Sequence, residues 1–178
     1  DTGDSHTYTL SGTDAASFEV VNGQLKLKDS VSADFEPKNT YSVTVTASDS
    51  GGLTTAQSFT LTVNNTNDAP TLANAIADQS VNEDSAFSFT VPADTFNDVD
   101  VGDTLTYTAT LSNGSALPFL LSFDATTQTL TGTPLNADVS SITITVTATD
   151  AAGVAISDSF TIAVANTNDA PTAIALSS

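Results

Sequence analysis

Apolar and polar residues alternate one by one over several short segments of the chain. The clearest are YSVTVTASD at 41–49, SFTLTV at 58–63, SAFSFTV at 85–91, SITITVTATD at 141–150 and SFTIAV at 159–164. This is the period of a β-strand that buries one face and leaves the other in solvent. No segment of similar length has the 3.6-residue period of an amphipathic helix. The pattern therefore predicts an all-β protein.

Turn-forming residues separate these segments at short and fairly regular intervals. Asn22 and Gly23, between FEVV and QLKL, are the pair that favours a tight two-residue hairpin. Many short strands with such turns are typical of β-sandwiches and, less specifically, of barrels. We therefore expect sandwiches, with a hairpin at Asn22–Gly23.

An exact repeat shows how the chain is organised. The heptapeptide NTNDAPT occurs at 65–71 and again at 166–172, a shift of 101 residues. The same shift aligns 41–72 with 142–173 without a gap, so that Phe59 matches Phe160 and Asp49 matches Asp150. Upstream, DTGDSHTYT at 1–9 matches DVGDTLTYT at 100–108 with a shift of 99. The chain therefore contains two copies of one module.

The two copies differ in what precedes this shared part. The second copy has about 28 further residues before DVGD, including the alternating segment at 85–91, and the first copy has no equivalent. We expect an incomplete module at 1–66 that lacks its opening strands, a full module at 67–168, and a linker with the start of a following module at 169–178. The missing strands have three open explanations: they lie in a longer parent chain, an inserted ligand-binding domain splits the module, or another chain supplies a strand.

The charge of the chain excludes several classes of partner. There are 21 acidic residues against three lysines and no arginine, which gives a formal net charge of −18. Beyond Asp68 there are twelve acidic residues and no Lys or Arg. This balance argues against nucleic acid and anionic membrane surfaces as partners, and no apolar run is long enough for membrane insertion. Because the later carboxylates have no cationic side chain to pair with, we expect a bound cation to neutralise some of them.

Acidic residues recur at predicted strand ends, turns and the module boundary. Asp98 and Asp100 lie among turn formers, Asp150 ends an alternating segment, and Asp68 comes shortly before a proline. An isolated Asp at such a position is usually only a turn former, but this set is repeated and unpaired. Carboxylate oxygens in a chain with no cysteine and one histidine favour Ca²⁺ over Mg²⁺ or zinc. Since there is no EF-hand loop, the predicted calcium site must be assembled from separate loops.

The order of these motifs resembles the cadherin repeat. DTGD at 1–4, DFE at 34–36, TASD at 46–49 and NNTNDAP at 64–70 correspond to its DxD, DxE, AxD and DxNDNxP motifs. The second module, with VNEDSAFSFTV and DVDVGDTLTYT, resembles the dystroglycan-type cadherin-like variant of large bacterial surface proteins. The resemblance covers nearly the whole chain. It implies two tandem Ig-like Greek-key sandwiches with calcium bound where modules meet.

The resemblance also implies which residues bind calcium. A complete junction would use Asp34, Glu36, Asn67 through its carbonyl, Asp68, Asp98, Asp100 and Asp150. Partial sites at the two ends would use Asp1, Asp49, Glu83, Asp138, Asn168 and Asp169. The linker is one residue shorter than in the family and begins with Asn instead of Asp, and the second module has NAD at 136–138 in place of DFE. These departures put one ion of the junction and the ligands of the second module's lower site in question.

The sequence is compatible with three classes of function. The favoured one is a calcium-rigidified spacer of an extracellular bacterial adhesin, whose partners are neighbouring cadherin-like modules and an inserted or adjacent ligand-binding domain. The alternative is a module that itself binds carbohydrate or protein. Exposed aromatics would favour sugar, but Tyr8 and Tyr107 occupy equivalent alternating positions that we expect to pack in the cores. Catalysis has the least support, since His6 is the only histidine and no nucleophile accompanies it.

Overall fold

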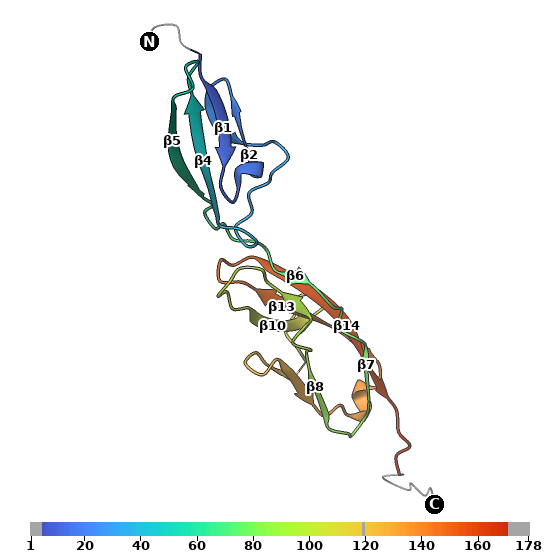
Figure 1. Cartoon of the computed structure of the whole chain (residues 1–178). Coiled ribbons are helices and arrows are strands. Elements are labelled where there is room, and N and C mark those ends of the chain that lie inside the picture. The colour runs from blue at the N-terminus through green and yellow to red at the C-terminus, as the bar shows by residue number, and fades with distance from the viewer. Residues whose placement is uncertain (1–4, 119, 171–178) are drawn as a thin grey trace, which may run out of the picture. The chain divides into compact units, whose positions relative to one another are not determined.

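The chain forms two compact units that consist of β-strands (Figure 1). The computed structural model describes residues 5–118 and 120–170. Unit 1 is Asp1–Thr66 and unit 2 is Asn67–Ser178. Within the described ranges the helices are two three-residue 3₁₀ turns, η1 (Ala15–Ser17) and η2 (Asn136–Asp138). The all-β prediction is confirmed, and none of the described helices has the length and apolarity needed to cross a bilayer.

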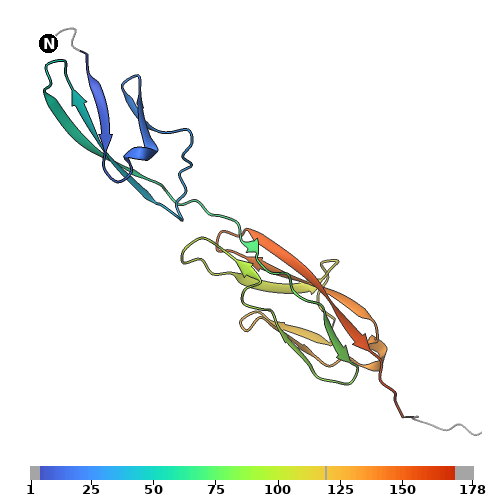
Figure 2. The ribbon, with the colours of Figure 1, turned by 45° about the vertical axis from the view of Figure 1, so that its right-hand side comes forward.

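Unit 1 has two layers of strands (Figures 1 and 2). One layer is the antiparallel sheet β1–β4–β5, from Thr7–Ser11, Thr40–Ser48 and Thr54–Thr62. The other is the hairpin of β2 (Phe18–Val21) and β3 (Gln24–Leu27). Asn22 and Gly23 join these two strands with φ angles of 51° and 77°. The predicted hairpin is confirmed, because these residue types tolerate the positive φ that a tight hairpin turn needs.

The core of unit 1 is small. Among its described residues the buried apolar side chains are Phe18, Tyr41 and Val43. The rings of Phe18 and Tyr41 meet edge to face with centroids 6.4 Å apart, an arrangement that aromatic pairs favour. The main core cluster of unit 2, with eleven buried apolar residues in its described part, is much larger.

A buried carboxylate ties the start of η1 to β4. Asp14 is 8% exposed, forms an ion pair with Lys38 and accepts a hydrogen bond from the backbone amide of Ser42 at 2.7 Å. Lys38 also lies 4.9 Å from the centre of the Tyr41 ring. The hydrogen bond from Lys38, followed by the one from Ser42, lowers the pKa of Asp14 below its ordinary value. Lys38, the lysine that lies close to the DFE motif in the sequence, therefore pairs with Asp14, which is outside that motif.

Replacing Asp14 by asparagine should destabilise unit 1 at neutral pH and make its stability less sensitive to acid. The pKa of Asp14 is lower in the folded state, so its contribution is present above the unfolded pKa, near 3.9, and is lost as pH falls through the lower folded value. Calorimetric melts of the full chain between pH 7 and pH 2.5 should show the difference from wild type shrinking in the acid range. Asp29→Asn is the control, since the Asp29 side chain is 94% exposed. An equal effect of both substitutions would contradict this role of Asp14.

Unit 2 has more strands and three sheets. A four-stranded sheet has the order β10–β13–β14–β7, a second has the order β11–β12–β8, and β6 pairs with β9. The strands are β6 (Thr71–Leu72), β7 (Gln79–Asn82), β8 (Phe87–Thr90), β9 (Phe96–Asn97), β10 (Thr106–Leu111), β11 (Leu121–Asp124), β12 (Thr129–Gly132), β13 (Ser141–Thr149) and β14 (Ala155–Ala165). Pairing is antiparallel except between β14 and β7, which lie side by side and parallel (Figures 1 and 2).

The alternating segments supply the core of unit 2. On β13 the buried residues are Ile144, Val146 and Ala148, every second position of the strand. The cluster also includes Phe160 of β14 and Leu130 of β12, with Phe87 and Val91 from the segment at 85–91. The sheets therefore enclose a continuous core, as the period of two predicts.

The strands of unit 1 correspond one to one with the last five strands of unit 2. β1 to β5 match β10 to β14 in sequence order and in pairing. Among the described residues of unit 1, no strand corresponds to β6, β7, β8 or β9. The prediction that the first module lacks its opening strands is therefore confirmed for residues 5–66.

Candidate metal centre

Three carboxylates from two loops meet at one end of unit 2. Asp98 and Asp103 lie between β9 and β10, and Asp150 directly follows β13. One oxygen of each lies within 4.8 Å of the others. Two of these three, Asp98 and Asp150, are among the predicted ligands. The sheet pairing of β10 with β13 places the start of one next to the end of the other and so brings the two loops together.

A tight turn fixes the position of Asp150. Its Oδ1 accepts a hydrogen bond from the amide of Val154 at 2.7 Å, and its carbonyl accepts one from Gly153 at 3.2 Å. Gly153 has a φ of 88°, a left-handed conformation that glycine adopts without strain. Asp49 of unit 1 makes the same two bonds, to Leu53 and Gly52, with the same lengths. The repeated Asp-x-x-Gly sequence thus folds as the same turn twice, and Asp150 is only 5% exposed.

The loop of Asp98 leaves one buried oxygen without a partner. Oδ1 of Asp98 accepts a hydrogen bond from the amide of Asp100 at 3.0 Å, which sets the turn. Oδ2 of Asp98 is buried and has no hydrogen-bond partner among the described residues. A buried carboxylate oxygen without a donor is costly and calls for a specific explanation.

The segment before β6 adds two more predicted ligands to this end of unit 2. The side-chain amide of Asn67 donates to Asp150 Oδ2 at 2.9 Å, and the backbone amide of Asp68 donates to Asp100 Oδ2 at 2.8 Å. The hydrogen bond from Asn67 is the main reason that the pKa of Asp150 lies below its ordinary value, with the amide of Val154 also contributing. Asp150 is therefore ionised at neutral pH. Of the predicted ligands, this end of unit 2 brings together Asn67, Asp68, Asp98, Asp100 and Asp150.

The chemistry of this donor set suits a hard divalent cation. Carboxylates about 5 Å apart repel each other by on the order of 3 kcal/mol per pair at an effective dielectric constant near 20. Unit 2 has no Lys or Arg in its sequence that could offset this repulsion. Calcium prefers carboxylate and amide oxygens from irregular loops, and a cation here would give Asp98 Oδ2 the partner that it lacks. The residues present therefore fit Ca²⁺.

Asp103 is a ligand candidate that the sequence interpretation missed. It follows Gly102 in a loop rich in turn-forming residues, so its sequence context alone predicts no more than a turn. The repeat offered a signal, since DVGD at 100–103 matches DTGD at 1–4, which makes Asp103 as much a part of the shared motif as Asp100. Turn formation and metal ligation favour the same residue type, so a single sequence does not separate them.

Unit 1 contains four of the predicted ligands. Asp34 and Glu36 lie in the loop between β3 and β4, where Oδ1 of Asp34 accepts a hydrogen bond from the amide of Glu36 at 3.3 Å. Asp49 lies at the opposite end of β4 from this loop, in the turn described above. Asp1 lies outside the described residues.

The remaining predicted ligands belong to unit 2: Glu83 directly follows β7, Asp138 ends η2, and Asn168 and Asp169 follow β14. Glu83 is 1% exposed, and its Oε1 accepts hydrogen bonds from Asn166 Nδ2 at 2.8 Å and Thr167 N at 2.6 Å, while Oε2 is buried with no hydrogen-bond partner among the described residues. Asp169 accepts a hydrogen bond from Asn136 at 2.6 Å. The carboxylate of Asp138 instead accepts one from the amide of Leu135, and Asn168 is exposed.

This second group is looser than the first. Among residues 5–118 and 120–170, Glu83, Asp138 and Asp169 do not form a trio of carboxylates with oxygens within 4.8 Å. Most of the following-module segment at 169–178 lies outside the described residues. Asp98, Asp103 and Asp150 are therefore the stronger candidates for holding a calcium ion.

Comparison with solved structures identifies the fold. The human protocadherin-24 EC1–2 structure superposes with a TM-score of 0.63 and 22% identity, covering 96% of this chain and 85% of that one. Human mucin-like protocadherin EC1–2 gives 0.61 and 20%, with 91% and 85% covered. Mouse cadherin-23 EC22–24 gives 0.64 and 21%, with 91% and 53% covered. At these identities the likeness establishes a cadherin-like sandwich fold.

A sequence-family profile gives the second comparison. The family described as "Putative Ig domain" matches residues 69–165, which is more than half of the chain and nearly all of the described part of unit 2. No curated protein sequence gives a significant match. The chain therefore belongs to the "Putative Ig domain" family, in a cadherin-like form of the Ig-like sandwich.

Proposed function

We propose that this chain is a calcium-binding module of an extracellular adhesion protein, in which the ion stiffens the connection between successive sandwiches. The observation that carries the proposal is the carboxylate trio of Asp98, Asp103 and Asp150 with a buried, unpartnered oxygen on Asp98. This trio lies in a fold shared with extracellular cadherin domains. The motifs that resemble those of large bacterial surface proteins support an adhesin of that kind as the parent protein.

The proposed ligands come from three segments of unit 2 and one loop of unit 1. Asp98, Asp103 and Asp150 would hold the ion through their carboxylates, and Asp100 and the Asn67 carbonyl would complete the set from unit 2. In the proposal Asp34 and Glu36 of unit 1 share ions with these groups. Ions shared by ligands of both units would restrict the motion of the polar segment that joins them, and would also offset the repulsion between the carboxylates. Such a spacer would present neighbouring ligand-binding domains.

The proposal is for a structural and binding module, not an enzyme. The described carboxylates of the trio lie in connecting loops, and their hydrogen bonds go to backbone amides and to Asn67. His6 is exposed in unit 1.

Calcium should raise the melting temperature of unit 2 in the full chain. Extracellular calcium modules have dissociation constants of ~10⁻⁴ to 10⁻³ M. At 10 mM free Ca²⁺ a single such site adds about 1.4–2.7 kcal/mol, which corresponds to roughly 5–15 °C in a domain of this size. Differential scanning calorimetry of the full chain in calcium and in EGTA measures the shift.

Magnesium at the same concentration is the ionic-strength control and should give a much smaller shift, since Mg²⁺ keeps its waters and demands stricter geometry. Small-angle scattering on the same samples tests whether calcium stiffens the connection between the units. We expect a narrower distribution of the radius of gyration in calcium than in EGTA. Equal melting curves in calcium, magnesium and EGTA would refute calcium binding. A calcium-dependent melt with unchanged scattering would refute only the stiffening.

A further inference from the structure

Polar contacts hold the first residues of unit 2 against its loops. Asn67 and Asp68 precede β6, which begins at Thr71. The side-chain amide of Asn67 donates to Asp150 Oδ2 at 2.9 Å and to the carbonyl of Asp68 at 2.8 Å, so both of its Nδ2 hydrogens have acceptors. The backbone amide of Asp68 donates to Asp100 Oδ2 at 2.8 Å. The segment therefore docks on unit 2 through donors that point at carboxylates of two loops.

The carboxylate of Asp150 has a donor on each oxygen. Oδ1 accepts from the amide of Val154 at 2.7 Å, and Oδ2 accepts from Asn67. The bond to Val154 belongs to the turn between β13 and β14, whose strands pair up to Thr149 and Ala155. The bond from Asn67 comes from a separate segment of the chain. Oδ2 is therefore the oxygen whose donor can be exchanged while the turn stays intact.

The Asn67 amide points into a region of negative charge. Asp150 is 5% exposed and has a carboxylate oxygen within 4.8 Å of oxygens of Asp98 and Asp103. Unit 2 has no Lys or Arg in its sequence. Hydrogen bonds to a charged acceptor are stronger than those between neutral groups. The partial positive charge of the Nδ2–H group thus supplies part of the stabilisation that a cation would supply at Asp150.

The other partly buried carboxylate of the trio differs in this respect. Asp98 Oδ1 accepts from the amide of Asp100, whereas Oδ2 is buried and has no hydrogen-bond partner among the described residues. The trio therefore offers a cation one oxygen without a donor, on Asp98. On Asp150 the cation meets an oxygen that Asn67 already occupies.

A divalent cation and the Asn67 amide are poor neighbours on one oxygen. Calcium bound to Asp150 Oδ2 would lie at ~2.3–2.6 Å from it, on the same short scale as the hydrogen of the N–H donor. Both carry positive charge on the side that faces the oxygen, so they repel each other, and little solvent is present at this buried position to screen the repulsion. The two partners of Oδ2 are therefore alternatives.

Given the calcium site of the proposed function, on which this inference rests, we propose that calcium binds Asp150 only by releasing the hydrogen bond from the Asn67 side chain. The Asn67 bond then stabilises the protein in the absence of calcium and lowers its apparent calcium affinity, because binding must first break it. The Asn67 backbone carbonyl, which is the proposed ligand, is independent of the side chain. Asn67 thus sets the calcium concentration at which the site fills.

Asn67→Ala removes the donor and keeps the backbone carbonyl. In the full chain it should lower the melting temperature of unit 2 by roughly 5–10 °C in EGTA and by clearly less in saturating calcium. Isothermal calorimetry should show calcium affinity raised by about tenfold, since a hydrogen bond to a charged group no longer has to be broken. Asn74→Ala is the matched control, because Asn74 donates to Asp94 outside the trio. Its effect should be equal in EGTA and in calcium, with affinity unchanged.

Side-chain amide signals in the NMR spectrum of the wild-type chain give a second readout that needs no substitution. The Nδ2–H signals of Asn67 should shift with calcium and saturate as the site fills, while those of Asn74 stay in place. Equal destabilisation by Asn67→Ala in EGTA and in calcium would overturn the inference, because the bond would then persist beside the ion. Weaker calcium binding by this variant would also overturn it, since the side chain would then be a ligand. Both results leave the calcium site standing, whereas a wild-type chain that binds no calcium refutes the proposed function and this inference together.

Discussion

Replacing Phe160 by alanine is expected to lower the free energy of unfolding of unit 2 by about 3–5 kcal/mol. Phe160 is 2% exposed and packs against Phe89 at the centre of the core, so its removal leaves a cavity between well-packed strands. For a domain of this size the loss corresponds to a fall in melting temperature of roughly 10–25 °C. Calorimetry of the full chain, in which the two units can melt separately, measures it.

The repeat provides a matched control at Phe59. This residue occupies the same register position in unit 1 but is 46% exposed, so Phe59→Ala should cost only about 1 kcal/mol. The comparison holds residue type, strand type and neighbouring sequence nearly constant. Equal losses at Phe59 and Phe160 would contradict the conclusion that unit 1 is open where unit 2 is covered.

Replacing Asp98 by asparagine is expected to weaken calcium binding by roughly tenfold or more and to stabilise the calcium-free protein. Asparagine keeps the Oδ1 acceptor for the Asp100 amide, so the turn should survive. The change removes one charge from the carboxylate trio, which relieves repulsion without the ion and removes an ionic ligand with it. Calcium titration by isothermal calorimetry and melting in EGTA measure the two opposite effects.

Asp94→Asn is the control for net charge. Asp94 is exposed in the turn before β9 and accepts hydrogen bonds from Asn74, outside the trio. It should change neither calcium affinity nor the melting temperature in EGTA by much. If Asp94→Asn weakened calcium binding as much as Asp98→Asn, the effect would come from overall charge, and the specific role of Asp98 would be wrong.

The alternating pattern predicted the long strands well. The segments 41–49 and 141–150 are β4 and β13 to within one residue at either end. β5 and β14 start about four residues earlier than their alternating segments, because their first residues pair through the backbone with β4 and β13 and need no buried side chain. The two-residue strands β6 and β9 are too short to produce a period.

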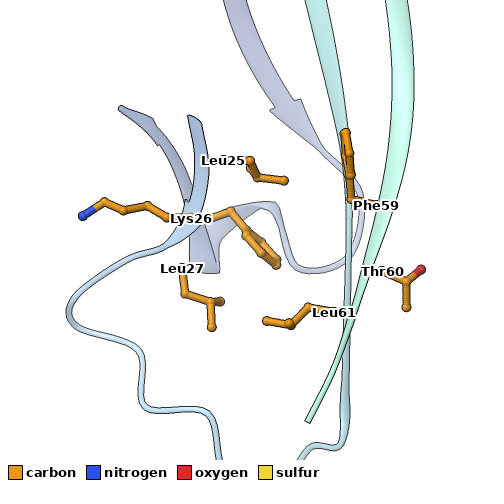
Figure 3. A pocket seen from close by; sticks show the side chains of 7 residues that line it. Leu25, Lys26, Leu27, Phe59, Thr60 and Leu61 are labelled. Atoms are coloured by element: carbon orange, nitrogen blue, oxygen red, sulfur yellow. The ribbon is translucent and has the colours of Figure 1, made fainter. Parts of the chain in front are cut away.

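Burial in unit 1 could not be predicted from the pattern. Phe59 and Tyr8 occupy apolar positions of good strands, and only the covering strands decide whether such positions are buried. Tyr8, which we expected to pack in the core, is 45% exposed. The repeat predicted that residues 5–66 do not contain these strands. It did not predict that a gap would lie between Leu25 and Phe59 (Figure 3). A local pattern reports which face of a strand is apolar, whereas burial depends on distant segments.

The candidate site was predicted in part. The resemblance to the cadherin repeat implied that Asp98, Asp100 and Asp150 act together, and all three lie at one end of unit 2. The prediction did not include Asp103, whose carboxylate lies with those of Asp98 and Asp150. Asp138, which it included, accepts a hydrogen bond from the amide of Leu135 in its own turn, and its ligand role stays a prediction. The pairing of β10 with β13 decides which of these aspartate oxygens lie close together. A single sequence does not specify that geometry.

The most direct test of the account is a crystal structure of the full chain grown in millimolar calcium, with anomalous difference density collected at long wavelength. The account predicts a peak in contact with the carboxylates of Asp98, Asp103 and Asp150, at the ~2.3–2.6 Å distances typical of calcium–oxygen bonds. Density without a peak at this end of unit 2, with the three carboxylates turned separately to solvent, would contradict it.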